Sequence, residues 1–472
     1  MDLPFHPLIN NWFSKTYGEP TAVQKEAWPL IAEGKHVLAV APTGSGKTLT
    51  GFLAALSRFA DGTYQADQLS VLYVSPLKAL NEDIKRNLIA PLEGIKNCFI
   101  EDGDYFPPVR VETRSGDTTQ NERRRFLISP PSILALTPES LAILLLNRRA
   151  REHLSHVQCL ILDEIHASLG NRRGAFLSCQ IDHLSLIAGE FQRIALSATV
   201  NPVEAAAEFA GGLKANARGG HEKRNVSIVA PPSEKKISFK VEFPEGKDEA
   251  ARQKKIQGEI AKGKDKDDFG ERYDTFIAYA IERIRKNRST LIYVESRRRA
   301  ERICYLINQT AGEVLSFTHH GSLSKDLRRA AEKALAEGKI PCVVATASLE
   351  LGIDIGNVDE VILAGSPFSA SSALQRVGRS GHGVGQESKG ILFPFHGLDL
   401  IASAAVSGAV EDRELEESAS LDNPLDVLSQ TILSLCTEAD RYEDELFTIL
   451  QGFYVFRTLP RQAFDGVVRM LS

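Results

Sequence analysis

An apolar strand that runs directly into a glycine loop and then a helix constrains this chain more than any other feature. Val37–Val40 precedes Ala41–Thr48, which has the sequence APTGSGKT, and a helical pattern begins at Thr48. Gly44 and Gly46 allow backbone N–H groups to turn inward, and the N-terminus of a helix favours anions. A coincidental glycine turn is the alternative, but the flanking strand and helix favour a phosphate cradle.

Two side chains of this loop suit the chemistry of a nucleoside triphosphate. Lys47 is expected to reach the β- and γ-phosphates, and the Thr48 hydroxyl is expected to hold Mg²⁺. Ala41 stands where the general phosphate-loop pattern has its first glycine, so the literal match is loose. The residues of this loop expected to bind the nucleotide are Thr43, Gly44, Ser45, Gly46, Lys47 and Thr48.

A pair of acidic residues follows another apolar strand. Asp163 and Glu164 come after Cys159–Leu162, and the carboxyl ends of parallel strands face the crevice in which α/β proteins bind ligands. Asp163 is expected to hold Mg²⁺, partly through water, and Glu164 to orient and deprotonate an attacking water. Alone, such a pair is often only a helix cap, but a phosphate loop in the same domain favours catalysis.

Upstream of the loop, Phe13 and Gln24 have a spacing that suits a purine clamp. An aromatic face can stack on a base, and an amide can pair with the N6 and N7 atoms of adenine. The alternative is a core phenylalanine and a surface glutamine. Gln24 is therefore a candidate for binding the nucleotide base.

Short strands rich in β-branched residues alternate with longer helical patterns along most of the chain. This alternation predicts an α/β fold with parallel sheets covered by helices on both faces. In the first half the strand candidates are Val37–Val40, Val71–Val74, Val109–Thr113, Ile133–Leu136, Leu160–Leu162 and Ile194–Leu196. In the second half they are Leu291–Val294, Val314–Phe317, Cys342–Ala345, Val361–Leu363 and Ile391–Phe393.

The length of 472 residues allows about three domains. A glycine-rich break at Gly211–Gly220 and a charged stretch at Lys247–Glu271 separate the two halves, and strand patterns stop near Glu414. The domains predicted from these features are residues 1–225, 226–413 and 414–472. The last segment has three helical patterns, at Pro424–Cys436, Asp444–Leu450 and Arg461–Leu471, which suit a small all-α module or the start of a winged helix.

Composition narrows the environment and the partners. Lys and Arg number 56 against 61 Asp and Glu, so the net charge of −5 provides no global attraction to polyanions, and local groups must bind any nucleic acid. The six cysteines lack CxxC or zinc-finger spacing, and adjacent His319 and His320 would face opposite sides of a strand. With no signal-peptide pattern and no long apolar run, we expect a cytoplasmic protein without a membrane span.

Late in the second half, Gln375–His382 contains two arginines and two glycines within eight residues. A solvated arginine loop is one interpretation. The sharper hypothesis is that Arg379 acts as an arginine finger on the γ-phosphate bound by the first domain. ATP would then join the two domains, and its hydrolysis would release them.

Taken together, these segments resemble the motifs of superfamily two helicases, at residues 41–48 (APTGSGKT), 163–166 (DEIH), 197–199 (SAT) and 375–382 (QRVGRSGH). Intermediate segments resemble motifs Ia, Ib, IV and V, at residues 75–80, 137–139, 290–296 and 346–354. Within the superfamily, DEIHA, ASLELGIDIG and a final motif ending in Gly-His are most similar to the large helicase-related (Lhr) family. The resemblance spans about residues 1–472 and implies two tandem RecA-like domains.

The resemblance also implies roles for individual residues. Those expected to couple the state of the nucleotide to domain closure are His166, Ser197 and Thr199. Those expected to contact the nucleotide from the second domain are Gly352, Asp354, Arg376 and Arg379. His382 stands where the general motif ends in arginine, which leaves a second finger open.

Motifs Ia and Ib begin with Ser-Pro and Thr-Pro, and proline suits the first position of a helix whose free N–H groups can bind a phosphate. A plain helix cap is the alternative at each position. Such groups contact the backbone of a nucleic acid and not its base edges. The residues expected to contact nucleic acid are Ser75, Pro76, Lys78, Thr137, Pro138, Glu139, Ser296, Thr346 and Ser348.

The Lhr resemblance implies ATP hydrolysis that drives 3′–5′ movement along single-stranded DNA in DNA repair, with ATP and Mg²⁺ as cofactors and single-stranded DNA or a DNA/RNA hybrid as partner. An RNA helicase is one alternative, because contacts to the backbone alone do not choose the sugar. An ATP-switched nucleic-acid clamp that does not unwind is another. The short interval Gly356–Gln375 leaves little room for a strand-splitting hairpin, and the last segment resembles an Lhr winged helix without its wing, so we expect a truncated core or a shortened family member.

Overall fold

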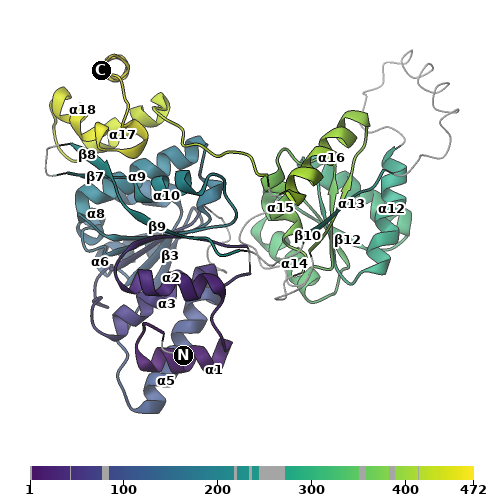
Figure 1. Ribbon diagram of the computed structural model, residues 1–472, viewed down its shortest axis with the longest axis horizontal. Helices are drawn as coiled ribbons and strands as arrows, with labels where there is room; N and C mark the ends of the chain where they lie inside the picture. Colours follow the sequence, from purple (N-terminus) through teal and green to yellow (C-terminus); the bar gives the residue numbers. More distant parts are fainter. Residues whose placement is uncertain are drawn as a thin grey trace. The chain divides into compact units, whose positions relative to one another are not determined.

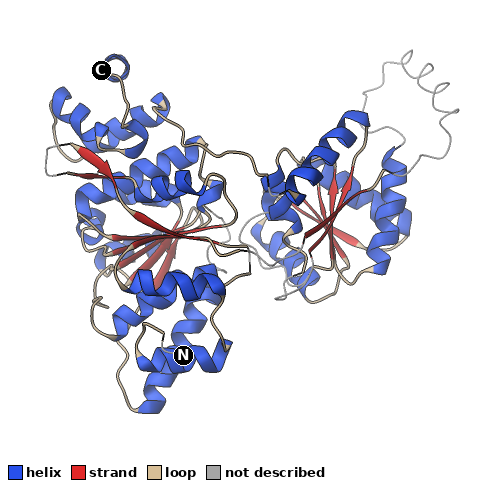
Figure 2. Ribbon diagram, in the orientation of Figure 1, coloured by secondary structure: helices blue, strands red, loops and turns tan. Residues whose placement is uncertain are grey.

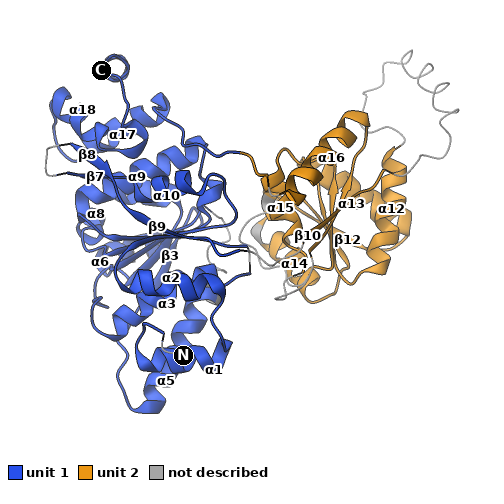
Figure 3. Cartoon of the chain, in the orientation of Figure 1, with its two compact units in different colours: residues 1–233, 417–472 blue, residues 234–416 orange. Residues whose placement is uncertain are grey.

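The chain folds into two compact units (Figure 1, Figure 3). Unit 1 comprises residues 1–233 and 417–472, and unit 2 comprises residues 234–416. The computed structural model describes residues 3–42, 44–76, 84–216, 220–232, 237–243, 272–349, 358–381, 388–412 and 414–472, without the side chains of Lys85, Arg86, Lys325 and Ser348.

Unit 1 is built on a seven-stranded parallel sheet with the strand order β3-β4-β2-β5-β6-β1-β9 (Figure 2). Its strands are β1 His36–Val40, β2 Val71–Val74, β3 Val111–Arg114, β4 Ile133–Leu136, β5 Cys159–Leu162, β6 Gln192–Ser197 and β9 Val226–Val229. The central strands are buried on both faces, which is why they are continuous apolar runs in the sequence.

Helices cover both faces of this sheet. They are α1 Pro7–Tyr17, α2 Ala22–Ala32, α3 Lys47–Ala60, α5 Ala90–Asp102, α6 Gln120–Ile128, α7 Pro138–Leu145, α8 Arg148–Leu154, α9 Arg172–Ala188 and α10 Val203–Gly211, with the short turns η1 Lys85–Ile89 and η2 Ile165–Ala167. Figure 1 shows α2 and α3 on one face and α9 and α10 on the other. Successive residues of β1 accordingly enter two cores, Leu38 on the side of α9 and Val37 on the side of α3.

Unit 2 is built on a six-stranded parallel sheet with the strand order β10-β15-β14-β11-β13-β12. Its strands are β10 Ile237–Val241, β11 Thr290–Tyr293, β12 Ser316–His319, β13 Cys342–Ala345, β14 Glu360–Ala364 and β15 Ser388–Phe393. Its helices are α12 Arg272–Lys286, α13 Arg297–Ala311, α14 Lys325–Ala336, α15 Ala370–Val377 and α16 Gly397–Glu411, with the short turn η4 Ala347–Leu349. None of the helices that the structure describes combines the length and the hydropathy that a bilayer crossing requires.

The predicted α/β class with two parallel sheets is confirmed, and every strand candidate overlaps a strand of one sheet. Four further strands were not predicted, namely β9 and β10 at the sheet edges and the antiparallel ribbon of β7 Leu213–Ala215 and β8 His221–Lys223. These strands are short, and all but one of their residues are partly or fully exposed, so they lack the buried apolar run that marks a central strand.

The domain limits also differ from the predicted ones. β9 pairs with β1, so the first sheet extends past residue 225 to Val229. The C-terminal segment is not a separate body, because residues 417–472 belong to unit 1. Its predicted helices are present as α17 Leu425–Cys436, α18 Glu443–Gln451 and α19 Arg461–Leu471, with the turn η5 Tyr454–Phe456.

The C-terminal helices join the hydrophobic core above the sheet of unit 1. Leu428, Leu435 and Phe464 are fully buried in the same cluster as the α9 residue Leu184. Polar contacts fasten this packing, since Tyr454 N donates to the Asp182 carboxylate at 2.8 Å. A prediction from the apolar pattern alone gives such helices but not the surface that they cover.

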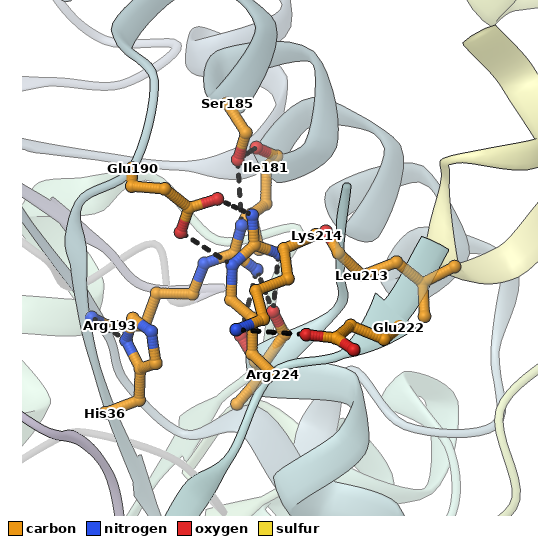
Figure 4. A network of polar contacts seen from close by, with 11 residues as sticks. His36, Ile181, Ser185, Glu190, Arg193, Leu213, Lys214, Glu222 and Arg224 are labelled. Carbon is orange, nitrogen blue, oxygen red and sulfur yellow. Dashed lines mark hydrogen bonds and ion pairs between the residues drawn. The ribbon is translucent and has the colours of Figure 1, made fainter. Parts of the chain in front are cut away.

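A network of two arginines fixes the end of α10 and the ribbon that follows it (Figure 4). Arg224 forms a two-pronged ion pair with Glu190, at 2.6 and 2.9 Å, and also donates to Gly211 O at 3.1 Å. Arg193 donates to the same carbonyl at 2.5 Å and to Ser185 Oγ at 2.8 Å. Burial lowers the pKa of Arg193 to about 10, and the guanidinium satisfies carbonyls that the helix leaves without a partner.

Candidate active site

The loop between β1 and α3 has the conformation of a phosphate cradle. Gly44 and Gly46 have φ angles of 82° and 79°, a region that favours glycine. A Cβ atom on Gly46 would lie 2.6 Å from Gln24 Nε2, so a larger residue would displace the Gln24 amide that supports the loop. The loop therefore needs both glycines, and α3 begins directly after Gly46 with Lys47.

Lys47 is buried at the base of this loop. Its Nζ donates to Ala41 O at 2.6 Å and to Pro42 O at 2.8 Å. Ser45 Oγ donates to Pro42 O at 2.7 Å, which tightens the same turn. The ammonium group is thus held beside the backbone that would surround a phosphate.

Gln24 supports the loop from α2. Its Nε2 donates to Gly46 O at 3.2 Å, and its Oε1 accepts from Thr21 N at 3.0 Å. The Thr21 hydroxyl donates to Ser45 O at 2.9 Å. Phe13, in contrast, is 1% exposed and packs edge-on against Trp28. Of the two interpretations, a residue that stacks on a base or a core residue, the structure therefore supports the core residue.

Asp163 lies at the end of β5, beside the first turn of α3. Thr48 Oγ1 is 3.4 Å from Asp163 Oδ2, and the Tyr73 hydroxyl donates to the same oxygen at 2.5 Å. Burial raises the pKa of Asp163 to about 6, and the charge of Glu164 adds to this, while the Tyr73 hydrogen bond and the charge of Lys47 oppose it. Sequence reasoning missed Tyr73, whose partner becomes visible only when β2 and β5 are known to be neighbours.

Glu164 and His166 connect this carboxylate to the Ser-Ala-Thr segment. Glu164 has a φ of 50°, in the left-handed region, and its N–H donates to Asp163 Oδ1 at 2.8 Å. His166 Nδ1 accepts from Ala198 N at 3.1 Å and lies 3.4 Å from both Ser197 Oγ and Glu164 Oε2. Because Nδ1 accepts a backbone N–H, it carries no proton, and its contact with Glu164 is not a charged pair.

Thr199, the last residue expected to couple nucleotide state to closure, is exposed at the end of the same segment. Ser197 is buried at the end of β6. The structure therefore brings His166 and Ser197 together and leaves Thr199 at the surface.

The residues expected to contact nucleic acid in unit 1 follow β2 and β4, which are neighbours in the sheet. Ser75 is buried, and its N–H donates to Leu136 O at 3.1 Å. Pro138 is the first residue of α7, and the Thr137 hydroxyl lies 3.2 Å from Ser140 Oγ. Glu139, in the first turn, pairs with Arg173, which the sequence reasoning did not single out.

In unit 2 the two arginines of the final motif lie on α15 and in the turn after it. Arg376 is buried, lies 3.5 Å from the Glu295 carboxylate and stacks over the ring of Tyr293. Arg379 is 4% exposed. Both arginine side chains are buried, so this segment is not the solvated arginine loop of the alternative interpretation.

Three residues of unit 2 were expected to contact nucleic acid, and the structure describes the side chains of two of them. Ser296 caps α13, and its hydroxyl accepts from Arg299 N at 3.3 Å. Thr346 follows β13, and its N–H donates to His319 O at 3.2 Å. Thr43, Lys78, Gly352, Asp354 and His382, and the side chain of Ser348, lie outside the described residues.

Oxygen donors that could hold a hard cation meet at Thr48 and Asp163. His319, the last residue of β12, and His320, which follows it, pair with different carboxylates, those of Glu332 and Glu301. Among the residues that the structure describes, no cluster of three His, Cys, Asp or Glu side chains could bind a metal, and the six cysteines are free thiols.

Two parallel RecA-like sheets, a phosphate loop and a DEIH carboxylate pair define a superfamily two helicase core. Three family models match: DEAD/DEAH box helicase over residues 21–207, helicase conserved C-terminal domain over residues 271–383, and the winged helix domain of large helicase-related protein over residues 408–472. The chain is a superfamily two helicase core that is most similar to the large helicase-related (Lhr) family.

Relatives and a solved structure agree with this assignment. The chain is 36% identical to the Lhr helicase/uracil glycosylase of Escherichia coli, over 99% of this chain and 32% of that protein. It is 37% identical to ATP-dependent helicase Lhr-Core protein 2 of Thermococcus barophilus, over 98% of this chain and 52% of that protein. The chain therefore spans only about a third to a half of the length of these relatives.

The structure is also similar to that of Mycobacterium smegmatis helicase Lhr bound to ssDNA and AMP-PNP. The TM-score is 0.85 at 38% sequence identity, and the match covers 99% of this chain and 58% of that one.

Proposed function

We propose that this chain is an ATP-dependent helicase or translocase that acts on single-stranded DNA. One observation carries the proposal: the phosphate-loop helix, the DEIH residues and the Ser-Ala-Thr segment meet at one place. Thr48 and the Glu164 backbone approach the Asp163 carboxylate, and His166, 3.4 Å from the Glu164 carboxylate, accepts from Ala198 N. The similar helicase Lhr of M. smegmatis is bound to ssDNA and AMP-PNP, which supports ATP and single-stranded DNA as ligands here.

In this proposal the glycine loop binds the triphosphate with its backbone N–H groups and the N-terminus of α3. Lys47 exchanges the carbonyls of Ala41 and Pro42 for the β- and γ-phosphates, which are stronger, charged acceptors. Thr48 and Asp163 would hold Mg²⁺, which neutralises phosphate charge when it is bound. Gln24 braces the loop and is the candidate to bind the base.

Glu164 is the proposed catalytic base. Its carboxylate orients a water molecule and takes its proton as the oxygen attacks the γ-phosphorus, while the bond to the β-phosphate oxygen breaks. ADP and phosphate leave. His166 is close enough to Glu164 to pass a change at the carboxylate to the backbone of Ala198.

Unit 2 supplies positive charge in the proposed mechanism. Arg379 would compensate the charge on the γ-phosphate, and Arg376 would contact the same nucleotide, with Gly352 and Asp354 beside it. The proposed nucleic-acid contacts come from motifs Ia and Ib in unit 1 and from Ser296, Thr346 and Ser348 in unit 2 (residues read from the sequence). Such contacts are to the backbone, so binding is expected to be largely independent of base sequence.

We further propose 3′–5′ polarity, a role in DNA repair, DNA/RNA hybrids as additional substrates and a cytoplasmic location, all of which follow from the resemblance to Lhr helicases. The chain matches only part of the longer relatives, so these properties are assigned to the core that it contains.

The test measures ATP hydrolysis and strand displacement with the same preparation. ATPase rates are compared across single-stranded DNA, single-stranded RNA and hybrids of matched sequence, and displacement is compared on duplexes with a 3′ or a 5′ tail. We expect stimulation by single-stranded DNA and displacement only from the 3′ tail. Stronger stimulation by RNA would favour an RNA helicase. Strong ATPase activity with no displacement would favour an ATP-switched clamp.

A further inference from the structure

Arg173, the second residue of α9, joins the two segments proposed to contact nucleic acid in unit 1. Its Nε and Nη2 donate to the two oxygens of Glu139 at 2.7 and 3.1 Å. Its Nη1 donates to Pro76 O at 2.7 Å. One guanidinium therefore bridges motif Ia, after β2, and motif Ib, at the start of α7.

This three-way contact requires arginine. A guanidinium is planar and can place two parallel N–H groups on a carboxylate while a third points elsewhere. A lysine ammonium could neutralise Glu139 but could not hold both its oxygens and the Pro76 carbonyl in fixed directions.

The bridge adds little to the stability of the fold. The Arg173 and Glu139 side chains are 42% and 54% exposed, and ion pairs at such exposure typically contribute roughly 0.2–1 kcal/mol, with a two-pronged arginine pair toward the upper end. We therefore expect the role of these contacts to lie in the position of Pro76 relative to Glu139 and in the neutralisation of the Glu139 charge.

The charge of Glu139 is a problem for a surface that binds phosphates. Burial opposes ionisation of this carboxyl, but the hydrogen bonds and charge of Arg173, with further hydrogen bonds from Glu139 N and Thr137, outweigh it and lower the pKa of Glu139. The group is therefore an anion at neutral pH. Without Arg173 it would repel the phosphates that the N-terminus of α7 is proposed to attract.

The base of Arg173 is held firmly to the chain that leaves the DEIH motif. Asn171 caps α9 by accepting from Gly174 N at 2.9 Å, and its amide donates to Ala167 O at 2.9 Å. Gly174 is indispensable here, because a Cβ atom would lie 1.5 Å from Ser168 O. These contacts fix the backbone from Ala167 to Gly174, and this backbone positions Arg173 close to the DEIH motif of the nucleotide site.

We propose that Arg173 is a positioning residue of the nucleic-acid site: it sets the spacing between Pro76, in the described part of motif Ia, and Glu139 of motif Ib, and it cancels the charge of Glu139. This inference rests on the proposed function. It assigns to Arg173 an effect on the binding of single-stranded DNA and not on the chemistry of ATP.

The experiment measures ATPase rates over a range of single-stranded DNA concentrations, with DNA binding followed in parallel by fluorescence anisotropy. Arg173→Ala is expected to raise the DNA concentration for half-maximal stimulation roughly tenfold or more, as for loss of a charge-assisted contact. The rate at saturating DNA is expected to stay within about twofold of the parent. Arg173→Lys is expected to recover only part of the affinity, because it restores charge without the fork.

Arg172→Ala is the matched control. Arg172 is the neighbouring arginine of α9, its side chain is 79% exposed, and it lies 3.5 Å from Asp426. Its removal changes the net charge equally and should leave the DNA dependence unchanged. An equal shift in this control would mean that charge alone matters and would overturn the positioning role.

Other outcomes are equally decisive. If Arg173→Ala melts far below the parent, Arg173→Lys carries the test, and parental DNA affinity in that variant overturns the inference. If the parent binds single-stranded DNA and Arg173→Ala binds it with the same affinity, this inference is overturned and the proposed function is not. A parent that binds no single-stranded DNA overturns the proposed function and this inference with it.

Discussion

The two units distribute their polar site residues in opposite ways. In unit 1 the candidate residues come from α2, the phosphate loop and the ends of β2, β5 and β6, and they contact one another. In unit 2 the candidate arginines come from one helix and the turn after it, and Arg376 is held by Glu295 and Tyr293 of its own unit.

This difference indicates a division of labour. Unit 1 has a preformed loop with positive-φ glycines and a buried lysine, so it is built to bind a triphosphate. Unit 2 offers buried guanidinium groups without a comparable loop among its described residues. Substitution of the buried lysine of the phosphate loop in unit 1 should therefore affect nucleotide binding, whereas substitution of the arginines of unit 2 should affect turnover.

The largest effect is expected from Lys47→Ala in unit 1. Loss of the ammonium removes the charge that pairs with the β- and γ-phosphates, so both nucleotide binding and ATPase activity should fall below detection. Binding of a fluorescent ATP analogue and phosphate release measure the two effects. Lys35→Ala, at an exposed lysine paired with Glu33, is the control. Retention of both activities by Lys47→Ala would remove the cradle from the mechanism.

Arg379→Ala in unit 2 is expected to slow turnover by roughly 10³-fold, the low end for an arginine finger, with much smaller loss of ATP affinity. Comparing kcat with the affinity for AMP-PNP separates the two. Arg285→Ala, at an exposed arginine of α12 paired with Glu313, is the matched control. A variant that loses ATP affinity as completely as Lys47→Ala would break the division between the units.

Glu164→Gln should retain ATP binding and reduce turnover by roughly 10²-fold or more, because the amide cannot take the proton of the attacking water. Single-turnover hydrolysis with prebound ATP measures this step. Glu152→Gln, at an exposed side chain of α8, serves as control. Hydrolysis at the parental rate would show that another group is the base.

The smallest effect concerns the stability of unit 1. Burial raises the pKa of Asp182 to about 6, although Arg193, Tyr454 N and Arg224 favour its charged form. Because the folded pKa lies above the unfolded one, the fold binds the proton more tightly, and the free energy of unfolding falls as pH rises from about 4 to about 6.

Asp182→Asn should remove this dependence. Its melting temperature relative to the parent should rise by a few degrees between about pH 4.5 and 7.5, equivalent to roughly 1–3 kcal/mol. Thermal melts at the two pH values give the difference, and Asp440→Asn, at an exposed position, should show none. A constant difference across the range would contradict the assignment of the titration to Asp182.

The sequence predicted the central strands and most of the nucleotide site because these residues obey local rules. Continuous apolar runs gave the buried strands, and the glycine loop sits where a strand meets a helix. The edge strand β10, in contrast, is half-exposed along its length and has no such run. The C-terminal helices were predictable as helices, but their apolar faces do not encode which unit they cover.

The supporting residues of the site escaped prediction for a related reason. Tyr73 and Arg173 act on partners far away in sequence, Asp163 at 90 residues and Pro76 at 97. A tyrosine in a strand or an arginine near the start of a helix is ordinary in itself. The importance of each follows only from the order of the strands, which sequence periodicity does not reveal.

The return of residues 417–472 to unit 1 makes unit 2 an insertion in the chain. A protease cut in either connecting segment alone would leave the molecule in one piece, because Leu428, Leu435 and Phe464 anchor the C-terminal fragment without a covalent link. Release of unit 2 requires both cuts. Both ends of unit 2 are thus covalently connected to the same unit.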